Sequence, residues 1–439
     1  MNGEDLNQYR TDAAIDGTML LNQCLEALGL VLEFNTKDFL SHQHAIRVGE
    51  GCVLIGEKLG LESRVLQKMY YAGLLHDVGK ISIDPKLLAK KGKLTDEEFE
   101  VIKEHTRQGS RIIATLPGMS ELALWIRWHH EWWNGRGYPD KLIQNEIPVE
   151  VQILSVMDCF DSLQTPRPDR DRISPEAAYV IIKEGSGSHF NPDILNLVLE
   201  LIGERTLVPG KSSERFLELK RKYIDLPFTN IDGKHWQVSG ISGLYPILRL
   251  FARVIDAKHK YTRGHSTRVS ILSKLIAEKM GLRPEEFALV EVAGLLHDAG
   301  KVSVPVEILD KPGKPSDEEW KLIKGHPGRS LDILSTIPAL SDIATLSGAH
   351  HEKHDGTGYP GRLKGEEIPL LSQIISVADT YDAITSTRAY RQGQPPEFAY
   401  NIIHKELGAQ FNSEVGEIFL DIPPKHISAL FDIYEVKDI

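Results

Sequence analysis

Residues 74–80 read LLHDVGK, and residues 295–301 read LLHDAGK. The two copies lie 221 residues apart, and the same shift relates further groups along the chain. These pairs are His44 and His265, His105 and His326, His129-His130 and His350-His351, Gly137-Tyr138-Pro139 and Gly358-Tyr359-Pro360, and Asp158 and Asp379. A shift that stays constant across separate motifs indicates a gapless internal duplication. Because the chain has 439 residues, two copies of this length fill nearly all of it.

The hydrophobic pattern predicts an all-α fold. Apolar side chains follow the 3.6-residue helical period near residues 20–28, 248–255 and 269–276, and the alternation typical of strands is scarce. Helix starts are predicted at residues 95–98 and 316–319, where Thr or Ser precedes a run of acids. We therefore predict two tandem helical domains, related by duplication, at residues 1–215 and 238–439. Residues 216–237 between them are predicted to form a linker or helical spacer, since stretches rich in Pro, Gly and Ser punctuate this region.

The composition narrows the class of protein. Hydrophobic residues make up 41% and charged residues 26%, as in soluble globular proteins. No apolar run approaches the roughly 18 residues that span a bilayer, and the acidic N-terminus lacks the features of a signal peptide. The three cysteines follow no disulfide pattern. We therefore predict a cytoplasmic protein that does not bind membranes. A net charge of −11 also argues against binding a nucleic-acid polymer, although a small anion could still bind at a local basic cluster.

The duplicated residues suit metal binding. On a helix, His297 and Asp298 lie within one turn of Lys301, so the three side chains can lean toward one site. An imidazole can bind one divalent metal, a carboxylate can bridge two, and Lys301 could then meet a phosphate oxygen. A lone His-Asp pair is more often a hydrogen bond at a helix end. The recurrence of the other groups in step with this pair favours metal binding.

The remaining motifs differ in how strongly each indicates a metal ligand. His265 and His326 are weak signals alone, because a single His before a helix is more often a cap. His350-His351 is stronger, since adjacent imidazoles on a helix point about 100° apart and suit two neighbouring metals, or one metal and a substrate contact. Asp379 can close the site as a ligand, whereas Asp382 is expected to have a structural role.

The donor set predicts the reaction class. Imidazoles and carboxylates without a thiolate suit Fe, Mn or Zn. Two such metals a few ångströms apart can activate a water and clamp the oxygens of a phosphoryl group. The chain has no Walker loop, no Gly-x-Ser-x-Gly elbow and no Cys/His nucleophile pattern. We therefore predict metal-assisted hydrolysis of a phosphoester.

The order His-Asp-x-Gly-Lys, then His-His-Glu-x-x-Asp-Gly-x-Gly-Tyr-Pro, resembles the HD-GYP family of metal-dependent phosphohydrolases. The motifs stand at residues 297–301 and 350–360, within a resemblance that extends from about 240 to 435 and recurs, somewhat eroded, from about 20 to 215. The family implies an all-α domain with two or three Fe or Mn ions that hydrolyses cyclic di-GMP, or in some members 3′,3′-cyclic GMP-AMP. A tandem pair resembles the Vibrio phosphodiesterases for the mixed dinucleotide.

The resemblance also implies roles for individual residues. Asp298 and Lys301 are the expected catalytic residues. The implied metal ligands are His265, His297, Asp298, His326, His350, His351 and Asp379, and in the first copy His44, His76, Asp77, His105, His129, His130 and Asp158. The implied substrate contacts are Lys80, Lys301, Gly358, Tyr359, Pro360, Arg388 and Arg391. For the two arginines, an ordinary solvated helix end is an equally good interpretation.

The resemblance implies two divalent metals per copy. Trinuclear family members carry a Glu four residues before the first ligand His, but this chain has Leu40 and Tyr261 there. Fe or Mn is favoured, and Zn, Ni or Mg is compatible with the donor set.

The two copies differ around the metal ligands. Asn134 replaces Asp355, Trp132-Trp133 stands where the second copy has Lys353-His354, and residues 164–167 differ from 385–388. The first copy could be a second active site, a regulatory domain that binds metal or nucleotide, or a structural partner. We expect the second copy to carry most of the hydrolysis and the first to bind metal.

The leading hypothesis is an enzyme that opens a cyclic dinucleotide, 3′,3′-cyclic GMP-AMP or cyclic di-GMP, to a linear product. One alternative is an HD-type phosphohydrolase of another nucleotide, either a 5′-nucleotidase or an alarmone hydrolase. Another is a metal-dependent nucleotide receptor, an interpretation that suits the first copy best. A homodimer or a signalling-protein partner is compatible with the sequence.

Overall fold

The structure is a computed structural model that describes residues 22–29, 44–88, 90, 92–116, 118–164, 173–203, 214–225, 245–257, 264–311, 313–387 and 392–433. Within these ranges every regular element is a helix, and the only strand-like features are isolated bridges. The predicted all-α fold is therefore confirmed. No helix in this part of the chain is long and apolar enough to cross a membrane.

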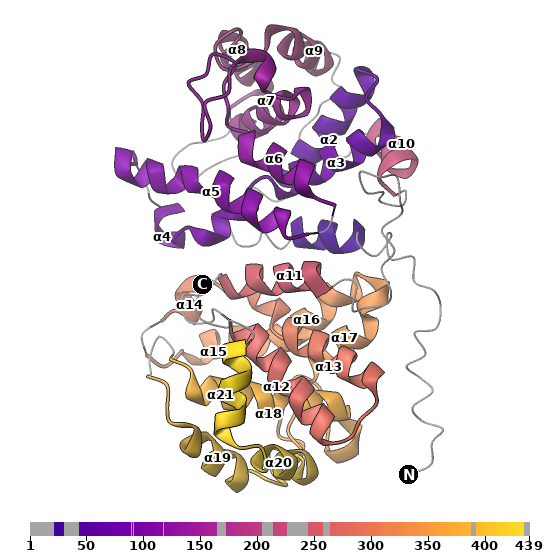
Figure 1. Ribbon diagram of the computed structural model, residues 1–439, viewed down its shortest axis with the longest axis vertical. Coiled ribbons are helices and arrows are strands. Elements are labelled where there is room, and N and C mark those ends of the chain that lie inside the picture. Colours follow the sequence, from indigo (N-terminus) through magenta and orange to yellow (C-terminus); the bar gives the residue numbers. More distant parts are fainter. Residues whose placement is uncertain are drawn as a thin grey trace. The chain divides into compact units, whose positions relative to one another are not determined.

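The described residues form two compact units, one within 16–237 and one within 238–439 (Figure 1). The N-terminal unit contains a helix at 22–29, followed by α2 (His44–Lys58), α3 (Ser63–Leu75), η2 (Val78–Ser82), α4 (Pro85–Leu88), α5 (Asp96–Ala114), α6 (Ser120–Trp128), η3 (Gln144–Glu146), α7 (Val149–Gln164), α8 (Pro175–Glu184), α9 (Pro192–Gly203), α10 (Glu214–Leu219) and η4 (Lys220–Ile224).

The C-terminal unit repeats this order. Its elements are α11 (Tyr245–Ala257), α12 (His265–Lys279), α13 (Pro284–Leu296), η6 (Ala299–Ser303), α14 (Val306–Leu309), α15 (Asp317–Lys324), α16 (His326–Ser335), η7 (Pro338–Leu340), α17 (Ser341–Gly348), η8 (Gly365–Glu367), α18 (Leu370–Thr385), α19 (Pro396–Lys405), α20 (Ser413–Leu420) and α21 (Pro424–Ile433). From α2 to α9, each helix begins 221 residues before its counterpart in this unit. The duplication therefore extends to the helix boundaries.

Helix caps account for two of these boundaries. The hydroxyl of Thr95 accepts a hydrogen bond from the backbone N–H of Glu98, and the carboxylate of Glu98 accepts one from the backbone N–H of Thr95. Ser316 and Glu319 form the same reciprocal cap at the start of α15. Each cap satisfies backbone donors that the first helical turn leaves unpaired. The predicted helix starts at these two places are confirmed.

One helix of the first copy is divided in the second. α5 runs without interruption over Asp96–Ala114, but the corresponding residues form α15 and α16, which meet at Gly325. Pro327 stands near the start of α16 where the first copy has Thr106. Proline lacks the N–H that an interior helical position requires, so a new helix begins at this point.

The charged segment after α9 packs onto the N-terminal unit. Phe216 of α10 is 1% exposed and lies 5.7 Å from the ring of Tyr70, and Leu219 and Ile224 are fully buried. The amide side chains of Asn22 and Gln67 donate hydrogen bonds to the carbonyl oxygen of Ile224. The predicted spacer at 216–237 therefore begins with residues that belong to this unit's core, and residues 226–237 lie outside the described part.

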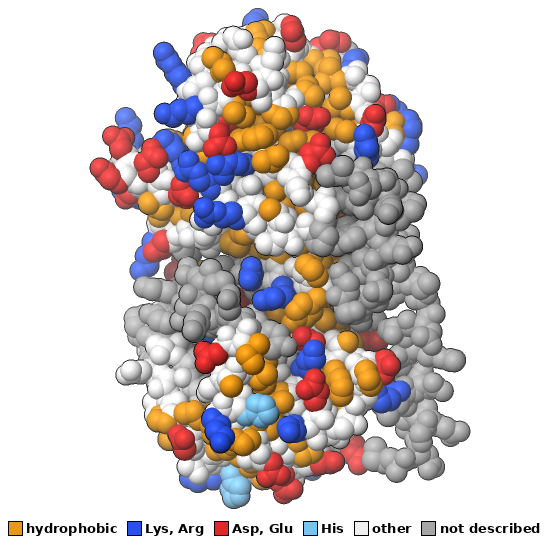
Figure 2. All heavy atoms as spheres, viewed as in Figure 1, with side chains coloured by type: hydrophobic (Ala, Val, Ile, Leu, Met, Phe, Trp, Pro, Cys, Tyr) orange, Lys and Arg blue, Asp and Glu red, His pale blue; other side chains and the backbone are white. Residues whose placement is uncertain are grey.

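Acidic and basic side chains are interspersed on the visible face of both units (Figure 2). Mixed charge of this kind gives no broad field of one sign.

Candidate metal centres

The seven candidate ligands of the C-terminal unit come from five helices and meet at one place. His265 begins α12, and Asp379 lies in α18. The pair His297-Asp298 directly follows α13, the pair His350-His351 follows α17 after one residue, and His326 begins α16. Imidazole and carboxylate atoms from all of these positions lie within 4.8 Å of one another in overlapping groups of three.

Close approach of the backbone brings these helices together. A Cβ added to Gly300 would lie 2.0 Å from the carbonyl oxygen of His326, so only glycine allows the turn after Asp298 to rest against α16. Ser330 locks this contact, because its hydroxyl donates to the carbonyl oxygen of His297 at 2.8 Å and accepts from the backbone N–H of Gly300 at 2.8 Å. Gly300 therefore sets the spacing between His297 and His326.

Asp298 lies between two groups of imidazoles. Its Oδ2 atom is 3.4 Å from Nε2 of His265 and 3.3 Å from Nε2 of His297. Its Oδ1 atom is 3.1 Å from Nε2 of His326, which in turn lies 3.3 Å from Nε2 of His350. One carboxylate therefore presents one oxygen to each group.

The outer members complete these two groups. Asp379 Oδ1 lies 3.3 Å from Nε2 of His265, on the side of His297. His351 joins His326 and His350 on the other side, and its ring centroid is 4.1 Å from that of His350.

The buried polar atoms in this cluster fit a metal. The Nδ1 atoms of His297, His326 and His350 each bond to a backbone carbonyl oxygen, at 2.7, 2.8 and 2.5 Å, which leaves Nε2 to face the site. Nε2 of His265 and of His297 and Oδ1 of Asp298 are buried without a hydrogen-bond partner in the described structure. Buried polar atoms are normally paired, and a divalent cation would satisfy all three of these.

The protonation states favour metal binding. Burial alone would raise the pKa of Asp298, but the neighbouring His297 and Lys301 hold that pKa well below its usual range, so the carboxylate is ionised. Burial lowers the pKa of His351 to about 3 and that of His350 well below its normal value, so both imidazoles are neutral. Burial also opposes a charge on His265, yet the carboxylates that surround it raise its pKa to about 10 without a metal. A cation would compete with this proton.

The N-terminal unit assembles the same cluster from the first copy. Asp77 places Oδ2 3.4 Å from Nε2 of His76 and Oδ1 3.6 Å from Nε2 of His105. Asp158 Oδ1 lies 3.4 Å from Nε2 of His44. His129 and His130 complete the group around His105.

The two clusters differ in their access to solvent. The side chain of Asp77 is 28% exposed, whereas that of Asp298 is 3% exposed. Lys80 and Lys301 each pair with the Asp three residues before them, and their side chains are 29% and 13% exposed. The second site is therefore drier, and charges in it interact more strongly.

A buried glutamate that the sequence analysis did not single out holds the Gly-Tyr-Pro loop. Glu352 is 3% exposed and accepts hydrogen bonds from the backbone N–H groups of Gly361 and Leu363, at 2.5 and 3.0 Å. In the first copy, Glu131 does the same for residues 140–142. The loop places the ring of Tyr359 5.0 Å from that of His351. The His-His-Glu sequence was the signal for this role, since the Glu directly follows two candidate ligands.

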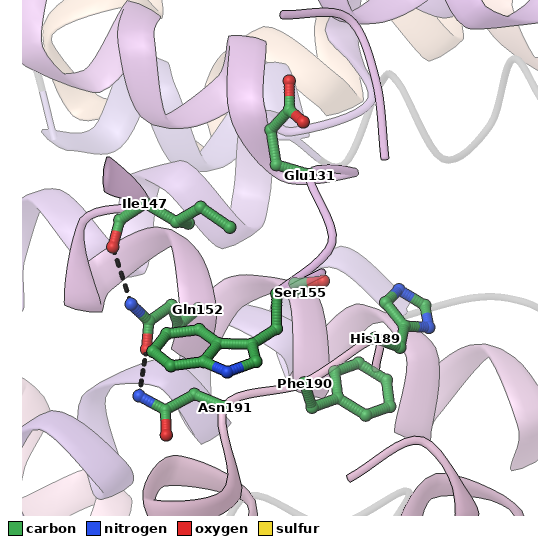
Figure 3. A pocket seen from close by; sticks show the side chains of 8 residues that line it. Glu131, Ile147, Gln152, Ser155, His189, Phe190 and Asn191 are labelled. Carbon is green, nitrogen blue, oxygen red and sulfur yellow. Dashed lines mark hydrogen bonds between the residues drawn. The ribbon is translucent and has the colours of Figure 1, made fainter. Parts of the chain in front are cut away.

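Figure 3 shows a small pocket in the N-terminal unit, next to the corresponding loop of the first copy. Gln152 donates from Nε2 to the carbonyl oxygen of Ile147 at 2.6 Å and accepts through Oε1 from Asn191 at 2.8 Å (Figure 3). His189 and Phe190 line another side, with their rings stacked 4.1 Å apart. The backbone N–H of Trp133 bonds to the carbonyl oxygen of His189 at 2.9 Å. These contacts fasten the loop to α7 and to the connection between α8 and α9.

A second missed residue, Arg268, anchors His265 through Asp382. Asp382 lies 2.7 Å from Nδ1 of His265 and accepts a hydrogen bond from Nε of Arg268 at 2.5 Å. Asp161 holds His44 and Arg47 in the same way in the first copy. Asp382 therefore orients a candidate ligand, in line with the structural role expected for it.

Some predicted site residues cannot be placed. Arg388 and Arg391, the expected substrate contacts, lie outside the described residues. Leu40, Tyr261 and residues 165–167 also lie outside them.

Comparison with known proteins gives relatives that match between 41% and 92% of this chain. "3′3′-cGAMP-specific phosphodiesterase 3" of Vibrio cholerae is 32% identical over 323 residues, which are 73% of this chain and 66% of that protein, slightly less than two thirds of its length. "3′3′-cGAMP-specific phosphodiesterase 1" of the same organism is 27% identical over 416 residues, 92% of each chain. A "cyclic di-GMP phosphodiesterase" of Thermotoga maritima is 37% identical over 181 residues, 41% of this chain and 49% of that one.

A solved structure and a family model agree with these relatives. The crystal structure of a cyclic GMP-AMP-specific phosphodiesterase of V. cholerae (V-cGAP3) matches with a TM-score of 0.61 and 25% identity, over 92% of this chain and 98% of that one. The model of the HD domain matches residues 33–194 and again residues 249–415, one segment in each unit. The chain therefore belongs to the HD domain family, with two such domains in tandem.

Proposed function

We propose that this protein is a metal-dependent phosphodiesterase that opens a cyclic dinucleotide, 3′,3′-cyclic GMP-AMP or cyclic di-GMP, to a linear dinucleotide. The observation that carries the proposal is the position of Asp298, whose two oxygens each face a separate group of buried imidazoles. The names of the relatives supply the class of substrate.

Each copy has the residues to hold two divalent metals, with Fe or Mn favoured by the nitrogen and oxygen donors. In the second copy, His265, His297 and Asp379 would hold one metal, His326, His350 and His351 would hold the other, and Asp298 would bridge them. In the first copy, the corresponding ligands are His44, His76 and Asp158, then His105, His129 and His130, with Asp77 as the bridge.

When bound, the two metals would supply Lewis-acid activation of a water and neutralise charge on the phosphate. The chain's own residues position the substrate. The ammonium group of Lys301 pairs with Asp298 and lies at the edge of the cluster, where it can contact a phosphate oxygen. Tyr359, held by the loop that Glu352 fastens, forms a wall beside His351. Arg388 and Arg391 remain proposed contacts for the phosphates or the guanine.

The test is turnover of both cyclic dinucleotides by the purified full-length protein loaded with Fe(II) or Mn(II), with analysis of the products. Asp298→Ala should lower kcat/KM by at least about 100-fold, because the bridging ligand supports an effect worth several kcal/mol. Asp332→Ala, which removes an exposed carboxylate of α16, is the matched control and should behave as the wild type. Full turnover by a folded Asp298→Ala variant would refute the assignment.

A nucleotide receptor remains a second candidate for the first copy, because Asp77 is far more exposed than Asp298. This role predicts that the first copy binds cyclic dinucleotide without forming product over hours. The Asp298→Ala variant tests this role, because only its first copy keeps the complete set of candidate ligands. Binding and product formation are measured on that variant.

A further inference from the structure

An aromatic residue and a lysine stand at the rim of both candidate sites. In the second copy they are Trp320 and Lys324 of α15, one turn apart and just before the ligand His326. In the first copy they are Phe99 and Lys103 of α5. Trp320 and Phe99 are exposed residues, at 44% and 43%. A single exposed aromatic is ordinary at a protein surface, but here an aromatic and a lysine recur together at the same place beside both ligand clusters.

Contacts connect Trp320 to the metal cluster. The ring centroid of Tyr359 is 5.0 Å from that of His351. The Nζ atom of Lys324 lies 5.4 Å from the ring centroid of Tyr359 and 5.8 Å from that of Trp320. The ammonium group is therefore within cation–π range of both rings. His351, Tyr359, Lys324 and Trp320 form a continuous row that leads outward from the cluster.

The first copy has the same row. The ring centroid of Tyr138 is 5.0 Å from that of His130 and 6.2 Å from that of Phe99. The Nζ atom of Lys103 lies 4.8 Å from the Phe99 ring and 5.5 Å from the Tyr138 ring. The arrangement is thus retained although the outer aromatic side chain differs.

The charge at the rim differs between the copies. Lys324 forms no ion pair with the part of the chain that the structure describes, so the two rings hold its ammonium without neutralising it. Lys103 pairs with Glu100 at 2.6 Å, and the second copy has Lys321 at the position of Glu100. The rim of the second copy is therefore the more basic of the two.

We propose that Trp320 and Lys324 form an outer subsite for the dinucleotide. The indole ring stacks against one purine base, and the ammonium group of Lys324 contacts the phosphate that is not being hydrolysed. This inference rests on the proposed function, since it assigns the part of the substrate that lies beyond the metals. Indole suits the role because its large π-face stacks on any base, and an unneutralised lysine attracts phosphate.

The first copy has the corresponding, weaker subsite. Phe99 offers a smaller ring than Trp320, and Glu100 offsets the charge of Lys103. The two copies therefore differ in affinity for the same dinucleotide, with the second copy binding more tightly.

Substitutions at Trp320 separate stacking from simple apolar contact. In the full-length protein, Trp320→Leu should raise KM by about tenfold or more and lower kcat much less, because stacking on a base contributes to binding. Trp320→Phe, which reproduces the residue of the first copy, should retain most of the affinity. Phe398→Leu is the matched control, because Phe398 is 46% exposed on α19 and lies outside the row. Equal losses in the Phe and Leu variants would overturn the stacking role.

A binding measurement tests the subsite independently of turnover. Calorimetry on chelator-treated full-length protein gives the dissociation constants of cyclic di-GMP and of 3′,3′-cyclic GMP-AMP. Trp320→Leu should weaken binding there as well, and Lys324→Gln should weaken it and reduce its dependence on salt. Lys279→Gln, at the exposed end of α12, is the control for charge. If the wild type turns over substrate but Trp320→Leu keeps wild-type KM and affinity, the subsite is refuted while the proposed function stands. If no turnover occurs and Trp320→Leu still weakens binding, the subsite stands and the proposed hydrolysis fails.

Discussion

Asp298 is the residue on which the candidate site of the second copy depends. Its two oxygens face separate imidazole groups, its side chain is 3% exposed, and one of its oxygens has no hydrogen-bond partner among the described residues. Asp77 has the same neighbours in the first copy but is 28% exposed. A carboxylate in a dry site interacts more strongly with a cation than one that water reaches, so the two equivalent residues differ in effect.

A second buried carboxylate, Asp256, gives a prediction for pH dependence. It is 6% exposed and accepts hydrogen bonds from the backbone N–H and the hydroxyl of Ser266, at 3.2 and 2.6 Å. Burial raises its pKa from 3.8 to about 6 in the metal-free protein. The folded protein therefore binds a proton more tightly than the unfolded chain, and this group makes stability fall as pH rises from about 4 to about 6.

The variant that tests this effect is Asp256→Asn in metal-free protein. Its gain in the free energy of unfolding over the wild type should grow between about pH 4 and pH 6, by up to about 3 kcal/mol, and stay constant at higher pH. Urea unfolding at a series of pH values measures the difference. A difference between the two proteins that does not change with pH would contradict the assignment.

Among the helices, the sequence predicted those boundaries that are set by residues close to them in the chain. The capping residues Thr95 and Ser316 mark helix starts because their side chains bond to the backbone three residues on. The division between α15 and α16 follows from Pro327, another signal that is local in the sequence. By contrast, the hold of Glu352 on the backbone of residues 361–363, and of Arg268 on Asp382, joins segments that only tertiary packing brings together. No periodicity in one sequence encodes such partners.

The segment α10–η4 is a further case in which tertiary packing was not evident from the sequence, and its packing can be tested. Its charged sequence suggested a spacer, but Phe216, Leu219 and Ile224 are apolar and buried. Phe216→Ala should destabilise the N-terminal unit by about 3–5 kcal/mol, because it leaves a cavity against α2 and α3. Leu217→Ala, at a neighbouring residue that is 43% exposed, should change stability by less than about 0.5 kcal/mol. Hydrogen exchange of peptides from α2 and α3 distinguishes the two, and identical exchange in both variants would restore the spacer interpretation.

Across the whole chain, the two copies share the candidate metal ligands and the residues that support them, and they differ in residues at the rim of the site. Both copies keep the candidate ligands, the Lys that pairs with Asp77 or Asp298, the Glu that fastens the loop and the Arg-Asp pair behind the first His. They differ in the exposure of Asp77 and Asp298, in the charge at positions 100 and 321, and in the outer aromatic residue. If the dinucleotide binds as proposed, these differences favour the second copy for an anionic substrate.

The metal content of paired variants tests this division of roles. The wild-type chain should hold about four divalent metals, two in each unit, and Asp77→Ala and Asp298→Ala should each lose the metals of one unit, as measured by elemental analysis of folded protein. Hydrolysis should respond unequally, with Asp298→Ala losing at least about tenfold more turnover than Asp77→Ala, because charge stabilisation is stronger in the drier site. The double variant controls for residual activity from either copy. Equal losses of turnover in the two single variants would mean that exposure of the bridging carboxylate does not set the rate, and that the two copies share the reaction.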